Sequence, residues 1–105
     1  MKITTWNVNG IRAAIQKGIF DWIENYQSDI VCLQEIKAKP EQVDTQLIKK
    51  IGYKHKINSA ERPGYSGVAT LFKDEPKRFA FGMGNEKFDN EGRIIQFGYK
   101  EFELF

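Results

Sequence analysis

The apolar run Ile30–Leu33 constrains the fold more than any other feature of this sequence. It lies between Asp29 and the polar pair Gln34 and Glu35. A continuous apolar run bounded by polar residues is typical of a strand that is covered on both faces. We therefore expect an inner strand here, with its polar end at Glu35.

The first half of the chain alternates strand and helix patterns around this run. Residues 2–8 are rich in β-branched and aromatic types and predict a strand. Apolar residues at helical spacing predict a helix over residues 11–26 that is broken near Gly18. A second helix is expected to begin at Pro40, where a missing N–H costs nothing, and to end at Gly52.

The second half reads as a series of strands joined by polar loops. Strands are predicted at 53–58, 67–72, 78–81, 93–99 and 101–105, with loops at 59–66 and 82–92. The layout indicates an α/β fold, with one layer of strands and helices on one face. The chain stops inside a strand pattern, which is unusual for a complete domain. We expect residues 1–105 to be the N-terminal part of a single larger domain whose C-terminal half is absent.

Composition excludes several classes of protein. Hydrophobic residues make up 41% of the chain, far too many for a disordered protein. No apolar run approaches the ~20 residues that cross a bilayer, and no signal peptide is recognisable. The single cysteine, Cys32, cannot form an intramolecular disulfide. A cytoplasmic protein without a membrane partner is the expectation.

Basic residues gather in two segments although the net charge is only +2. Lys2, Arg12 and Lys17 lie in the first twenty residues, which contain no acid, and residues 49–62 hold a second group. Basic surfaces of this kind attract phosphates. An ordinary solvated face explains the same pattern, and charge alone leaves both interpretations open.

Polar side chains follow two of the predicted strands. Asn7 and Asn9 lie at the end of the first strand, and Glu35 ends the covered strand. If the strands are neighbours, these groups emerge at one rim of the sheet, where such folds bind ligands. Carboxylate and amide oxygens suit Mg²⁺ or Mn²⁺. Spacing alone favours the simpler interpretation, in which Asn7 is a turn residue and Glu35 a surface carboxylate.

Four segments carry a family resemblance. They are Trp6-Asn-Val-Asn-Gly-Ile-Arg-Ala13, Leu33-Gln-Glu-Ile-Lys37, Gly64-Tyr-Ser-Gly-Val-Ala69 and Asp89-Asn-Glu-Gly-Arg-Ile-Ile95. In this order they closely resemble the exonuclease III family of apurinic/apyrimidinic endonucleases, within the endonuclease/exonuclease/phosphatase superfamily. The resemblance covers the whole chain.

The resemblance implies a fold and a reaction. The fold would be one half of a four-layer, DNase I-like α/β sandwich, a mixed and largely antiparallel sheet with helices on one face. Each half of the family's domain is expected to contribute one sheet. The implied reaction is Mg²⁺-dependent hydrolysis, with Mn²⁺ as a substitute, of the phosphodiester 5′ to an abasic site in double-stranded DNA. Exonuclease and 3′-phosphatase activities accompany it in relatives.

The resemblance also implies roles for individual residues. Glu35 and Asn7 match metal-site and catalytic residues, and Lys37 is placed to pair with Glu35. Asn9 stands where some relatives carry an aspartate, so a metal-binding role is less expected there. Arg12, Ala13, Lys17 and Tyr65 match DNA-contacting positions, while Trp6, Trp22 and Phe72 are assigned to the core.

Two family signatures have no match in this chain. The family's Asp-x-Asn pair, which carries the base, and its terminal Asp-His pair are absent from the sequence. We therefore expect these residues to be inactive without the missing half, supplied in cis or in trans. Two alternatives remain: an inactive nucleic-acid-binding fragment, and a superfamily phosphodiesterase with another substrate.

Overall fold

The secondary structure follows the predicted order. The computed structural model describes residues 1–81, 92, 95–98 and 102–105. Its elements are β1 (Ile3–Asn7), α1 (Ile11–Gln16), α2 (Ile19–Tyr26), β2 (Ile30–Gln34), a 3₁₀ turn (Pro40–Gln42), α3 (Thr45–Lys50), β3 (Lys54–Asn58), β4 (Val68–Phe72), β5 (Arg78–Phe81), β6 (Ile95–Gly98) and β7 (Glu103–Leu104). Most of the loop predicted at 82–92 lies outside the described residues.

The first sheet has the strand order β1-β2-β4-β3 and is mixed. β1 and β2 are parallel because α1 and α2 cross between them, whereas β4 is antiparallel to both β2 and β3. Val31 and Leu33 pack into the cluster formed with the helices. Ile30 and Cys32 belong to a second cluster on the opposite face. The prediction that β2 is covered on both faces is therefore confirmed.

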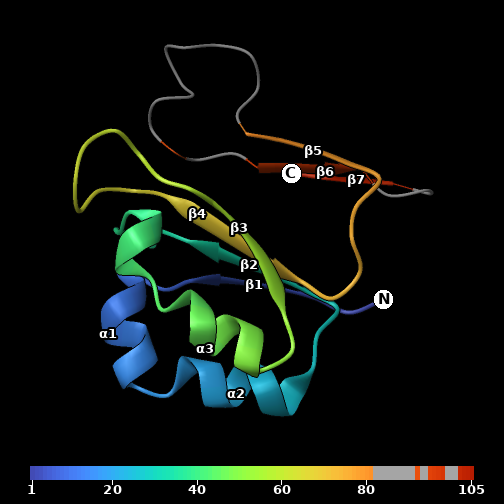
Figure 1. Ribbon diagram of the computed structural model, residues 1–105, viewed down its shortest axis with the longest axis horizontal. Coiled ribbons are helices and arrows are strands. Elements are labelled where there is room, and N and C mark those ends of the chain that lie inside the picture. Colours follow the sequence, from blue (N-terminus) through green and yellow to red (C-terminus); the bar gives the residue numbers. More distant parts are fainter. Residues whose placement is uncertain (82–91, 93–94, 99–101) are drawn as a thin grey trace.

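The helices lie together on one face of the first sheet (Figure 1). The predicted break near Gly18 is confirmed, since this glycine adopts a left-handed φ of 95° at the start of α2. The single helix predicted from Pro40 is wrong. Val43 is extended, and the Asp44 carboxylate accepts the Leu47 N–H at 3.0 Å, so α3 starts afresh at a capped Asp44.

The chain forms a second sheet, which corrects the expectation of one sheet for this stretch. β5, β6 and β7 make an antiparallel sheet of their own. This sheet lies on the side of the first sheet opposite the helices (Figure 1), and Ile95 packs there against Ile30 and Phe72. The apolar face expected to await the missing half is thus covered in part by the chain's own C-terminal strands.

The fold is otherwise the predicted α/β type. Phe72 is buried, as predicted. No described helix is long and apolar enough to span a bilayer. The arrangement that bears on function is the parallel pairing of β1 with β2, because it brings the polar ends of both strands to one rim.

Candidate active site

The ends of β1 and β2 lie side by side. In the parallel register Asn7 is the partner of Gln34, so both strands stop at the same level. The turns beyond them are joined by backbone hydrogen bonds, with the Gly10 N–H donating to the Glu35 carbonyl at 2.8 Å and the Ile11 N–H to the Ile36 carbonyl at 2.9 Å. The two turns therefore form one rigid rim.

Four of the predicted site residues meet on this rim. The Asn7 side-chain NH₂ donates to the Glu35 carboxylate, and the Asn7 side-chain oxygen Oδ1 accepts the Asn9 backbone N–H at 3.0 Å. The Lys37 ammonium donates to the Asn9 side chain at 2.5 Å and lies 4.0 Å from a Glu35 oxygen. Lys37 thus pairs with Glu35 as predicted. In this arrangement Asn7 orients the carboxylate, and Lys37 supplies positive charge beside it.

The rim also holds strained backbone. Non-glycine residues rarely adopt positive φ, yet Asn9, Glu35 and Lys37 have φ of 46°, 53° and 53°. Ser66, whose carbonyl accepts the Lys37 N–H at 2.7 Å, has a φ of 48°. Conformations of this kind persist only where the surroundings impose them, and they gather at functional sites. The strain gives this rim a marker that does not depend on residue type.

The donor set fits a hard divalent cation only in part. Glu35 contributes a carboxylate, while the amide oxygens of Asn7 and Asn9 already accept hydrogen bonds. Among the described residues, no group of three or more His, Cys, Asp or Glu side chains gathers to hold a metal. Mg²⁺ held by one carboxylate keeps most of its water. Glu35 is the residue that would hold it here.

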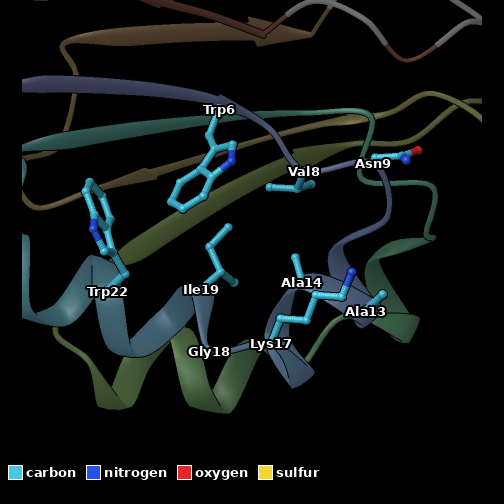
Figure 2. Close-up of a pocket in the computed structure, with 9 residues that line it drawn as sticks. All are labelled: Trp6, Val8, Asn9, Ala13, Ala14, Lys17, Gly18, Ile19 and Trp22. Atoms are coloured by element: carbon cyan, nitrogen blue, oxygen red, sulfur yellow. The ribbon is translucent and has the colours of Figure 1, made fainter.

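The predicted DNA-contacting residues of α1 lie beside the rim. The Arg12 guanidinium donates to the Lys37 carbonyl at 3.2 Å. Ala13 and Lys17 line a groove of about 430 Å³ that also reaches Asn9 (Figure 2). Arg12 and Ala13 therefore lie on α1 and Lys17 directly after it, with Arg12 in contact with the rim and the other two lining the groove that reaches Asn9.

Trp6 and Trp22 line the same groove, which corrects their assignment to the core. Their side chains are 38% and 42% exposed, and their rings meet edge to face at 5.2 Å (Figure 2). Spacing cannot show whether a neighbouring element closes over a face, so their exposure was not predictable.

Tyr65 lies in the loop that joins β3 to β4. The Arg62 guanidinium carbon lies 5.1 Å from the centroid of the Tyr65 ring. The next residue, Ser66, is bonded to Lys37, so the loop reaches the rim. The loop that carries Tyr65 is therefore hydrogen-bonded to the turn that carries Glu35.

Cys32 and His55 lie away from this rim, on β2 and β3, and β4 separates the two strands. Burial raises the pKa of the Cys32 thiol, which favours the unreactive protonated form. Burial, and then the neighbouring Lys56, lower the pKa of His55. Neither side chain adds a nucleophile or a base to the site.

The chain matches the Endonuclease/Exonuclease/phosphatase family over residues 4–105. It is 42% identical over 106 residues to the DNA repair nuclease APEX1 of Danio rerio, a match that covers 99% of this chain and 34% of that protein. It is 43% identical over 96 residues to an exodeoxyribonuclease of Bacillus subtilis, covering 90% of this chain and 37% of that one.

Solved structures show the same fold. An AP endonuclease from Archaeoglobus fulgidus superimposes with a TM-score of 0.84 and 29% identity, over 98% of this chain and 38% of that chain. A 3′ phosphatase from Neisseria, solved with a product DNA hairpin, gives a TM-score of 0.82 and 25% identity, over 98% of this chain and 39% of that chain. The chain spans about a third of the length of the curated relatives.

Proposed function

The chain belongs to the Endonuclease/Exonuclease/phosphatase family, and we propose that it supplies the N-terminal part of a Mg²⁺-dependent DNA-repair nuclease. The reaction is hydrolysis of the phosphodiester 5′ to an abasic site, with exonuclease and 3′-phosphatase action as further activities. Double-stranded DNA with an abasic site is the proposed substrate. The remainder of the domain would be supplied by further sequence, in cis or in trans.

One observation carries the proposal. On the rim where β1 and β2 end, the Asn7 amide is hydrogen-bonded to Glu35 and the Lys37 ammonium lies 4.0 Å from that carboxylate, in a chain 42% identical to a DNA repair nuclease. The position is the one at which sheets with helical crossovers bind ligands. Strained backbone at Glu35 and Lys37 adds independent support, because such strain gathers at working sites.

The contacts of the rim residues indicate a separate role for each. Asn7 holds the Glu35 carboxylate in one orientation, and Lys37 places a positive charge where a phosphate oxygen would approach. A bound Mg²⁺ would supply further charge stabilisation to the phosphoryl oxygens. Preorganised charge of this kind is the largest contribution in phosphoryl transfer.

Lys17 and Arg12 are proposed to contact phosphates rather than bases. Lys17→Ala and Arg12→Ala are each expected to weaken duplex binding to a similar extent for all sequences, because phosphate contacts carry no sequence information. Each change is also expected to lower the slope of log affinity against log salt by about one unit. Fluorescence anisotropy with labelled duplexes at several salt concentrations measures both quantities.

Lys77→Ala is the matched control for these variants, because Lys77 is an exposed lysine outside both basic segments. It removes the same charge and is expected to leave the slope unchanged. A loss of affinity that depends on base sequence, or an unchanged slope in Lys17→Ala, would contradict the assignment.

The donor set favours one alternative, a module that binds nucleic acid without hydrolysing it. The resemblance puts Asn9 where some relatives carry an aspartate, and Glu35 is the carboxylate that the rim offers. Binding of an abasic duplex, with and without Mg²⁺, tests the proposal against this alternative. The nuclease interpretation predicts tighter binding with Mg²⁺ that Glu35→Ala abolishes, whereas the binding module predicts no effect of the metal.

A further inference from the structure

The loop Ser59–Gly67 is anchored by a lysine that the proposed site does not include. The Lys39 ammonium donates to the Ala60 carbonyl and to the Glu61 carbonyl, the latter at 3.2 Å. An ammonium that donates to two backbone carbonyls holds a loop in place by charge-assisted hydrogen bonds. The loop tip, Glu61–Gly64, is exposed, while Ala60 is buried.

Further hydrogen bonds join this loop to the segment Ile36–Lys39. The Ser59 hydroxyl donates to the Ala38 carbonyl at 2.8 Å. At the other end of the loop, the Lys37 N–H donates to the Ser66 carbonyl at 2.7 Å, and the Ile36 N–H to the Gly67 carbonyl at 3.1 Å. The segment that follows Glu35 therefore holds both ends of the loop.

Gly92 also lies against the loop. A β-carbon at this buried position would collide with the backbone of Ser59 and Ala60. Gly92 also has a positive φ of 62°. The loop backbone is thus enclosed near Ser59 and Ala60.

The anchored loop carries groups suited to a nucleic-acid backbone. The Arg62 guanidinium lies against the Tyr65 ring. A cation and an aromatic ring presented together are the usual contacts to phosphates and sugars. Because the Ser66 carbonyl accepts a hydrogen bond from the Lys37 N–H, the loop that carries Arg62 and Tyr65 is linked to the turn that carries Glu35.

We propose that Lys39 is a positioning residue that holds the Ser59–Gly67 loop against the Glu35 turn, so that Arg62 and Tyr65 contact the backbone of the DNA on which the Glu35 site acts. The DNA contact rests on the proposed function, whereas the coupling of loop and turn does not. Lys39 acts through the loop, because its ammonium donates hydrogen bonds to two loop carbonyls.

Hydrogen exchange of the free chain tests the coupling. In Lys39→Met, the amides of Ile36 and Lys37 are expected to exchange about tenfold faster, because the loop whose far end supplies their acceptors, the Gly67 and Ser66 carbonyls, loses its anchor at Ala60 and Glu61. Leu71, in the middle of β4, is expected to keep its protection. Lys39→Arg retains a charged donor and is expected to restore slow exchange. Lys49→Met, the matched charge removal on α3, is expected to change nothing.

Binding of an abasic duplex tests the consequence for DNA. Lys39→Met is expected to weaken binding about fivefold or more, and Lys39→Arg to recover most of the loss. Should Lys39→Met fold poorly, Ser59→Ala, which removes only the bond to the Ala38 carbonyl, is expected to give the same pattern with a smaller change.

The outcomes separate the possible roles of Lys39. Weaker binding with unchanged exchange at Ile36 and Lys37 would make Lys39 a direct phosphate contact and overturn the proposal. Faster exchange with unchanged binding would overturn the role of the loop in DNA contact. If the wild-type chain binds no duplex at all, the proposed function fails, and the exchange data alone still decide whether Lys39 holds the loop.

Discussion

Purified on its own, the 105-residue chain is expected to leave an abasic duplex uncut in the presence of Mg²⁺. Incision is expected to appear when a second polypeptide, covering the part of the Bacillus subtilis exodeoxyribonuclease beyond the matched region, is added. The rim brings Glu35, Asn7 and Lys37 together, but none of them is placed as a base that could activate water. The sequence also lacks the Asp-x-Asn and Asp-His pairs expected of the family.

Release of a labelled product strand in a denaturing gel measures this reaction. The complementing polypeptide alone and the intact relative serve as negative and positive controls. The difference between the chain alone and the reconstituted pair is expected to exceed about 10³-fold, because both a base and much of the charge stabilisation are missing. Metal-dependent incision by the chain alone, abolished in Glu35→Ala, would show that these residues suffice for catalysis.

Glu35→Ala is expected to lower the rate of the reconstituted enzyme by about 10²–10³-fold, the cost of removing one preorganised electrostatic group. The change removes the carboxylate that Asn7 orients and that Lys37 faces. It is also expected to shift the Mg²⁺ concentration needed for half-maximal rate upward. Glu35→Gln, which keeps the shape and removes the charge, should show a similar loss.

Glu24→Ala, which removes an exposed carboxylate of α2, is the control for this substitution. It is expected to leave both rate and metal dependence unchanged. Rates for Glu35→Ala close to the wild type at low Mg²⁺ would remove Glu35 from the site. A loss in Glu35→Ala without a shift in metal dependence would place Glu35 outside the metal shell.

The second sheet has a consequence for how the chain behaves without a partner. β5–β7 cover part of the face that Ile30 and Phe72 present, so the first sheet is not left bare. In this C-terminal part of the chain, exposed apolar side chains include Phe79 and Phe81 on β5, each 51% exposed, and Phe105, 73% exposed. Self-association of the isolated chain would use this surface.

Local pattern was sufficient for most of the secondary structure. The apolar run Ile30–Leu33 predicted an inner strand, and Gly18 predicted the break between α1 and α2, because both effects depend on residues adjacent in the chain. The start of α3 was predicted wrongly, at Pro40 instead of after Asp44. Both residues are suitable helix starts by type, and the helix begins where the Asp44 carboxylate accepts the Leu47 N–H in the folded chain.

Residue identity and order were enough to predict the family and the candidates Asn7, Glu35 and Lys37. The parallel pairing of β1 with β2, which brings these candidates to one rim, is visible only in the folded chain. The folded chain also shows that Trp6 and Trp22 line an open groove and that Lys39 anchors a loop 21 residues away in sequence. Contacts between distant segments depend on how whole elements pack, and no local pattern records that packing.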